Sequence, residues 1–178
     1  MRSLSSVVMG VFLSTLIDST FVAPSATALA ACSAISFFTN ASTEIYPSAL
    51  GDPAYLTAKD HYWSAANADY TPACVVFPTS AEHVSQIVQL LLNYTDVEFA
   101  LKSGGHNPNV GFASTDGGVL ISFSSLANTT YNAEEGTADI GPGARWGDVL
   151  TALESENVAV VGGRIGKCLN SERRMITD

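Results

Sequence analysis

A short loop in the middle of the chain combines residue types that could bind an anion and supply a nucleophile. It reads Lys102-Ser103-Gly104-Gly105-His106-Asn107. Because consecutive glycines let backbone N–H groups turn inward and approach an anion closely, the loop suits a pyrophosphate. It differs from the dinucleotide fingerprint of doubly wound folds, in which Gly-x-Gly-x-x-Gly opens a helix. Taken alone, the loop is also compatible with a tight turn that carries an incidental histidine.

The elements before this loop predict a β-α-β unit. Residues 74–77 form a β-branched run that is typical of a strand. Thr79, followed three residues later by Glu82, has the pattern of a capping box and predicts the start of a helix. Apolar residues then recur at the spacing of one helical face, at Val84, Ile87, Val88, Leu91 and Leu92. Residues 99–103 predict a second strand, and the glycine loop follows that strand directly.

Further short elements are predicted after the loop. Residues 119–122 have the composition of a strand, and residues 132–136 separate two short runs as a hairpin turn does. The apolar spacing over 145–156 predicts a second amphipathic helix, and residues 158–161 predict a buried strand. The predicted fold class is therefore α+β, with small sheets flanked by helices.

Several glycine-containing segments occur in a fixed order along the chain. They are Ser103-Gly104-Gly105-His106-Asn107, Gly111-Phe112, Asp116-Gly117-Gly118-Val119-Leu120-Ile121, Gly141-Pro142-Gly143-Ala144 and Trp146-Gly147-Asp148-Val149. This series, within Tyr62 to Gly166, resembles the PCMH-type FAD-binding domain of the vanillyl-alcohol-oxidase superfamily. It is most similar to the secreted branch related to berberine bridge enzyme and the carbohydrate oxidases. The resemblance implies only the N-terminal portion of that domain, because the family's pattern stops after Gly166.

The resemblance also implies a set of cofactor-binding residues. The backbone from Ser103 to Asn107 would hold the FAD pyrophosphate, and His106 would bond covalently to the 8α-methyl carbon of the flavin, since a neutral imidazole nitrogen is a competent nucleophile. Lys102 stands where the family often has Arg. The lysine keeps a positive charge near the phosphates but lacks the planar guanidinium that binds phosphate through two hydrogen bonds. Further backbone contacts to the cofactor are expected at Gly111, Gly141, Gly143, Gly162 and Gly163. For the last four glycines, the alternative is a role in turns.

The activity implied by the resemblance is that of an FAD-dependent oxidoreductase. Such an enzyme oxidises a small alcohol, sugar or secondary metabolite by hydride transfer to FAD, and O₂ commonly reoxidises the flavin. The partners expected are therefore a small-molecule substrate and O₂. No residue of this sequence can be assigned as the general base, and no residues have metal-ligand spacing or form a Gly-x-Ser-x-Gly elbow. Two alternatives are a non-catalytic secreted glycoprotein that binds a ligand and a mispredicted gene fragment.

The charge balance argues against two classes of partner. Eight basic residues against seventeen acidic ones give a formal net charge of −9. Because such a chain repels phosphate backbones and anionic lipid, we expect neither nucleic acid nor a membrane surface as a partner.

The N-terminal sequence predicts secretion. Arg2 precedes an apolar run over 7–17, and small residues follow, so residues 1–30 read as a signal peptide with cleavage near Ala28 or Ala30. Three Asn-x-Ser/Thr acceptors and two cysteines that can pair in an oxidising compartment fit an extracellular location; they are Asn40, Asn93, Asn128, Cys32 and Cys74. The mature chain then divides into an N-terminal extension (31–69), a partial FAD-binding domain (70–166) and a divergent tail (167–178).

The tail contains a third cysteine, Cys168, that has two interpretations. Some members of the family attach FAD at a second point, a Cys two residues after a Gly, which is the spacing of Gly166 and Cys168. Alternatively, Gly166-Lys167-Cys168 can be encoded as GGT-AAG-TGT, which contains a common 5′ splice-donor sequence, and the polar tail would then be translated intron. We favour the second interpretation, which predicts a truncated chain with impaired function.

Overall fold

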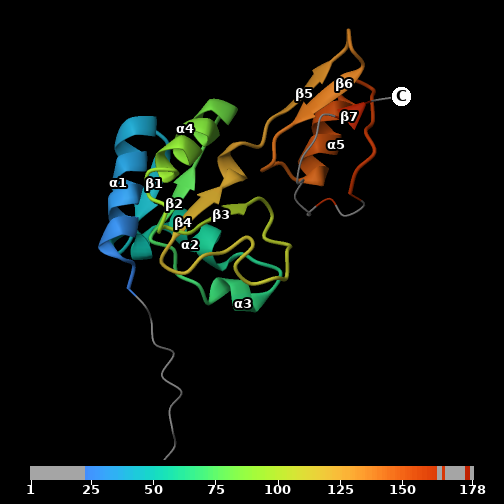
Figure 1. The fold of residues 1–178 in the computed structure, drawn as a ribbon. Coiled ribbons are helices and arrows are strands. Elements are labelled where there is room, and N and C mark those ends of the chain that lie inside the picture. The colour runs from blue at the N-terminus through green and yellow to red at the C-terminus, as the bar shows by residue number, and fades with distance from the viewer. Residues whose placement is uncertain (1–22, 164–165, 167–174, 177–178) are drawn as a thin grey trace, which may run out of the picture.

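Two sheets organise the chain in a computed structural model, which describes residues 23–163, 166 and 175–176 (Figure 1). The first sheet has the order β1 (Ser42–Ile45), β2 (Cys74–Phe77), β4 (Val119–Ser122) and β3 (Phe99–Lys102). Strands β2, β4 and β3 run parallel, and β1 is antiparallel to β2. The second sheet is antiparallel, in the order β5 (Thr129–Asn132), β6 (Thr137–Ile140) and β7 (Met175–Ile176). The α+β class is therefore confirmed.

The predicted β-α-β unit is present as β2, α4 (Ala81–Leu91) and β3. Strand β4 lies between β2 and β3 and pairs with both, so the helix crosses over one intervening strand. The predicted capping box of Thr79 and Glu82 is wrong. The helix is capped by Ser80, whose extended backbone lets its hydroxyl accept a 3.1 Å hydrogen bond from the N–H of His83.

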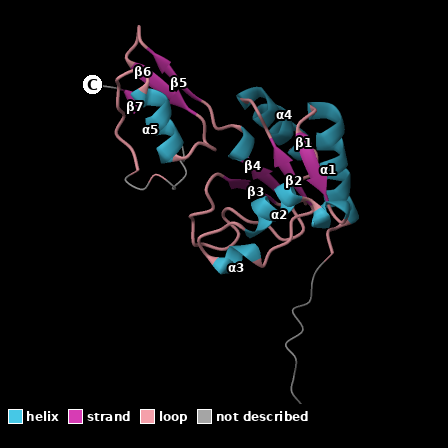
Figure 2. Cartoon of the chain, turned by 180° about the vertical axis from the view of Figure 1, so that it is seen from behind, coloured by secondary structure: helices cyan, strands magenta, loops and turns pink. Residues whose placement is uncertain are grey.

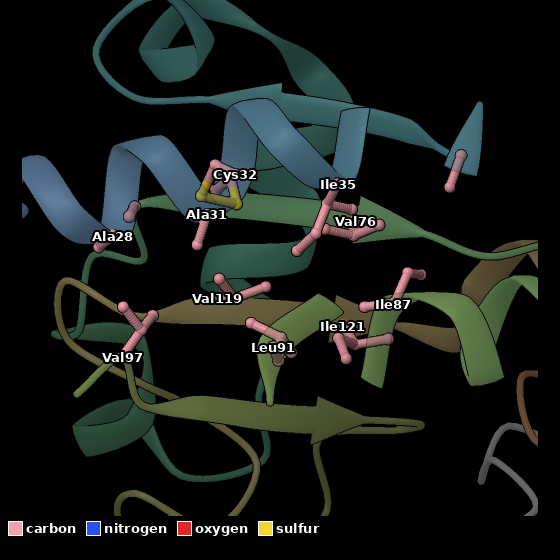
Figure 3. Close-up of a cluster of buried hydrophobic side chains, with 13 residues drawn as sticks. Ala28, Ala31, Cys32, Ile35, Val76, Ile87, Leu91, Val97, Val119 and Ile121 are labelled. Carbon is pink, nitrogen blue, oxygen red and sulfur yellow. A yellow bond between two sulfur atoms is a disulfide. The ribbon is translucent and has the colours of Figure 1, made fainter. Parts of the chain in front are cut away.

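Helices cover both faces of the first sheet. Helix α1 (Ala26–Thr39) and α4 lie side by side on one face (Figure 1). The 3₁₀ turn η1 (Ser48–Gly51), α2 (Pro53–Asp60) and α3 (Ala65–Ala68) lie on the other side (Figure 2). Alternate residues of β2 and β4 therefore enter two separate cores, and Figure 3 shows the core beneath α1 and α4.

Helix α1 was not predicted from the sequence. Its buried residues do have helical spacing, at Ala28, Ala31, Cys32 and Ile35, but most of them are small and the outer face is also apolar. The amphipathic contrast that identifies a surface helix is consequently weak. The helix begins after Ser25, so signal-peptide cleavage near Ala28 or Ala30 would fall within its first two turns. Residues 1–22 of the predicted signal peptide lie outside the described residues.

The pairing of Cys32 with Cys74 is confirmed. The disulfide joins the middle of α1 to the first residue of β2, and both cysteines are fully buried (Figure 3). It closes a segment with a sequence separation of 42. The bond therefore fastens α1, which lies in the N-terminal region, to the central sheet.

The second sheet is built around a hairpin and one helix. The predicted turn at 132–136 is confirmed, because the Asn132 carboxamide oxygen accepts bonds from the N–H groups of Glu134 and Glu135 and Gly136 has φ 61°. Helix α5 (Trp146–Glu154) packs on this sheet through Trp146, Val149 and Leu153. The predicted strand at 158–161 is wrong. These residues form no strand, and Val161 is 87% exposed. A short apolar run becomes a strand only where a partner strand is available for hydrogen bonding.

None of the helices in the described ranges combines the length and the apolar character that a membrane crossing requires.

Candidate functional site

A cavity of about 500 Å³ opens at the carboxyl ends of the three parallel strands. Phe77, Lys102 and Ser122, the last residues of β2, β3 and β4, all line it, together with Ser103 and Gly104 of the glycine loop. Helix α2 closes one side. In open sheets of parallel strands, ligands bind at this edge because the loops that follow the strands converge there.

The charges in the cavity oppose those of the chain as a whole. The chain carries −9, yet none of the described residues that line the cavity is an Asp or Glu. The lining has two basic side chains, Lys102 and Arg145, and also His61. Six hydroxyl groups complete it, from Ser42, Thr57, Ser103, Ser122, Ser124 and Ser125. Hydroxyl donors and cations without carboxylates make a site for a negatively charged ligand.

The glycine loop takes a conformation that only glycine adopts readily. Gly105 is buried and has φ 65°. A Cβ there would lie 2.9 Å from both the His61 carbonyl oxygen and the Tyr62 ring, so the loop approaches the residues after α2 more closely than any side chain allows. The N–H of Trp63 donates a 2.9 Å bond to the Gly105 carbonyl and fixes this approach.

His106 points to the surface rather than into the cavity. Its side chain is exposed, it is absent from the cavity lining, and its ring centroid lies 5.8 Å from that of Trp63 in an edge-on arrangement. Trp63 itself is 70% exposed. The predicted flavin anchor is therefore accessible at the end of the glycine loop and has an aromatic neighbour that the sequence did not connect with it.

A buried asparagine in α3 supports the residues after His106. Asn67 is fully buried, and its Nδ2 donates a 3.2 Å bond to the Asn107 carbonyl. Its Oδ1 accepts a 2.6 Å bond from the Ser114 hydroxyl, which in turn accepts from the N–H of Gly111. The segment that follows His106 is thus held at two points by one side chain. Sequence reasoning missed this residue because its partners are 40 and 47 positions away and no local pattern connects them.

Lys102 is buried under the loop and engaged with α2. Its ammonium group donates to the Ala58 carbonyl and lies 3.6 Å from the centroid of the Tyr62 ring. Burial lowers the pKa of the amine to about 8. The amine therefore attaches the end of β3 to α2, and its predicted contact with phosphate stays a prediction.

The turn at Gly141 and Gly143 lies beside the glycine loop. The Ser103 hydroxyl donates to the Pro142 carbonyl, which joins two segments that the sequence assigned to one site. A Cβ on Gly141 would lie 2.4 Å from the Leu126 carbonyl oxygen, and one on Gly143 would lie 1.8 Å from that of Phe123. Both glycines thus permit close packing on the segment that contains the 3₁₀ turn η2 (Phe123–Ser125). Their contact with the cofactor stays a prediction.

Two further predicted glycine contacts lie over a tryptophan ring. A Cβ on Gly162 would be 2.1 Å from the Trp146 ring, and one on Gly163 would be 2.4 Å from it. The main chain therefore packs closely on the indole, and the contact of both glycines with the cofactor stays a prediction. By contrast, Gly111 has φ 84° and open space around it. Cys168 lies outside the described residues, and among the described residues no group of His, Cys, Asp and Glu could hold a metal ion.

Comparison with known proteins identifies the family of this chain. An FAD binding domain model matches residues 72–166. An FAD-linked oxidoreductase of Arthroderma benhamiae is 40% identical over 112 residues, which are 63% of this chain and 22% of the relative. The FAD-dependent monooxygenase sdcF of Emericella nidulans is 42% identical over 115 residues, which are 64% of this chain and 24% of the relative. The chain thus spans about a quarter of the length of these relatives.

Solved structures show the same fold. A chitooligosaccharide oxidase matches with a TM-score of 0.61 at 26% identity, over 80% of this chain and 28% of that protein. The 6-hydroxy-D-nicotine oxidase of Arthrobacter nicotinovorans matches with a TM-score of 0.60 at 26% identity, over 72% of this chain and 27% of that protein. The match covers the N-terminal part of the PCMH-type domain that the sequence predicted. The chain therefore belongs to the FAD-binding-domain family of FAD-dependent oxidoreductases.

Proposed function

We propose that this chain forms the flavin-binding part of an FAD-linked oxidase and that His106 attaches the flavin covalently. The observation that carries the proposal is the cavity at the strand ends. In a chain of net charge −9, this cavity is lined by the glycine loop, two basic side chains and no carboxylate. A pyrophosphate is the part of FAD that needs such a lining.

The residues present fit the cofactor. Gly104 lines the cavity without a side chain, so a phosphate can approach the backbone there, and hydroxyl groups in the lining can donate to phosphate oxygens. Arg145, at the start of α5, adds a planar guanidinium suited to phosphate. We assign the backbone of 103–107 to the pyrophosphate, and Gly111, Gly141, Gly143, Gly162 and Gly163 to further contacts along FAD.

His106 is placed to react because its imidazole is exposed at the end of this loop. In the proposed attachment, the imidazole nitrogen that bears no hydrogen would supply the electron pair for a bond to the 8α carbon of the flavin. One 8α C–H bond would break, and the other ring nitrogen would give up its proton. O₂ takes up the two electrons and two protons that the overall reaction releases. The covalent bond would then hold the ring beside the exposed Trp63.

The activity proposed for the whole protein is oxidation of a small alcohol, sugar or secondary metabolite. Bound FAD supplies the acceptor for a hydride from the substrate, and O₂ is the proposed final oxidant. The described residues position the cofactor, and we assign none of them as the general base. Relatives named as monooxygenases and solved structures named as oxidases support this class.

We also propose that the protein is secreted. The disulfide between Cys32 and Cys74 supports this, because disulfides persist in oxidising compartments. The three glycosylation acceptors at Asn40, Asn93 and Asn128 are all exposed, as an extracellular glycoprotein requires.

The test is in-gel flavin fluorescence of the acid-denatured protein, recovered from the medium of a eukaryotic host. Wild type should show fluorescence that migrates with the protein band, and His106→Ala should lose it. His83→Ala, which removes a histidine from α4, is the matched control and should keep it. A well-expressed wild type without fluorescence would refute covalent attachment and would favour a non-catalytic binding module.

A further inference from the structure

An apolar surface remains uncovered at the end of α1. Phe37 and Phe38 are 78% and 66% exposed, and their rings contact each other edge to face with centroids 4.9 Å apart. Leu92, directly after α4, is 72% exposed. Figure 1 shows that α1 and α4, the helices at whose ends these residues lie, pack side by side. Large apolar side chains gathered on a surface indicate that something covers them.

A groove of about 470 Å³ runs between the two helices at this point. It is lined by Phe38, Thr39, Gln86, Gln89, Leu90 and Asn93. The lining has one aromatic ring, two carboxamides from glutamine and no charged side chain. This combination suits a neutral sugar, which has an apolar face of C–H groups and an edge of hydroxyl groups.

The sequence supplies such a sugar inside the groove itself. Asn93 is followed by Tyr94 and Thr95, which makes it an acceptor for N-linked glycosylation. Its Nδ2 donates to the carbonyls of Gln89 and Leu90, both at 3.3 Å. A glycosylated carboxamide keeps one N–H, so one of these bonds can remain and hold the first sugar close to α4.

We propose that Asn93 carries an N-linked glycan whose first sugar lies in this groove and packs on Phe38. The inference rests on the proposed secretion, because N-linked glycans are added only to chains that enter the secretory pathway. The aromatic face of Phe38 attracts the C–H face of the sugar, and Gln86 and Gln89 face its hydroxyl groups. Because the sugar is tethered within the groove, its effective concentration there is high. The glycan thereby covers the apolar surface.

Occupancy is tested first on the full chain secreted from a eukaryotic host. Enzymatic release of N-glycans converts each occupied Asn to Asp, which peptide mass spectrometry locates. Asn93 should be converted in wild type and in Thr95→Ser, which keeps the acceptor sequence, but not in Thr95→Ala. If Asn40 or Asn128 is converted and Asn93 is not, the inference fails while secretion stands. If the protein does not reach the medium, both fail.

Packing on Phe38 is tested by a double-mutant cycle. Thr95→Ala should lower the thermal unfolding midpoint by about 2–4 °C in the wild-type background and leave it unchanged in Phe38→Ala. Asn128→Gln removes the acceptor of another groove and is the control, since its effect should be equal in both backgrounds. Equal effects of Thr95→Ala in the two backgrounds would show that the sugar does not pack on Phe38 and would overturn the inference.

Discussion

Replacing Asn67 by leucine tests whether α3 holds the glycine loop in position. The substitution keeps the side-chain volume close to that of asparagine but removes the bonds to the Asn107 carbonyl and the Ser114 hydroxyl. Ser114 is 2% exposed, so its hydroxyl would lose a partner that water cannot replace. A buried polar group without its partner costs about 1–3 kcal/mol, and a lost bond to the more accessible Asn107 carbonyl costs about 1 kcal/mol. The free energy of unfolding should therefore fall by about 2–4 kcal/mol.

The measurement is urea unfolding, together with flavin fluorescence per unit of protein. Asn67→Leu should lower both, because the segment that directly follows His106 loses its two bonds to Asn67. Asn109→Ala is the matched control: it lies in the same loop, is exposed, and uses only its backbone N–H to bond Asn107. This control should change the free energy of unfolding by less than about 0.5 kcal/mol. An Asn67→Leu variant with wild-type stability and full flavin content would refute the positioning role.

Three further predictions follow from the same structure. In denaturant unfolding, Gly105→Ala should lower the free energy of unfolding by about 2–3 kcal/mol, and it should also lower the flavin content. Gly111→Ala should lower the free energy of unfolding by only about 1 kcal/mol, because Gly111 has a positive φ but open space around it. Burial lowers the pKa of Lys102 to about 8, so above that pH the unfolded chain binds more protons than the folded chain. The free energy of unfolding should therefore rise between about pH 8 and pH 10, and Lys102→Met should remove this rise. Replacing both Cys32 and Cys74 by serine should lower the free energy of unfolding in urea by about 4 kcal/mol, because the disulfide closes a sequence separation of 42 residues. An unchanged urea midpoint would contradict this prediction.

The sequence predicted the central part of the fold because its signals there are local. Strands β2 and β4 are short runs that contain β-branched residues, and α4 has a clear apolar face. Helix α1 was not predicted, because its outer face is apolar as well, at Phe37 and Phe38. The strand expected at 158–161 does not form, since strand formation depends on a partner that periodicity cannot reveal.

The candidate site was predictable to a similar extent. The glycine loop was identified by its composition, and its position at the end of β3 follows from the β-α-β pattern. Contacts between distant segments were not predictable: the bond from Asn67 to the loop, the burial of Lys102 beneath it, and the packing of Gly162 on Trp146. Glycines that approach a cofactor and glycines that approach another side chain have the same sequence signature.

The most direct test of the central claim is the intact mass of the denatured, purified protein, followed by peptide mapping. We predict a mass increase equal to one FAD, less the two hydrogens lost on attachment, that maps to the peptide containing His106. A folded wild-type protein without this increase, or one whose FAD maps to another residue, would contradict the account.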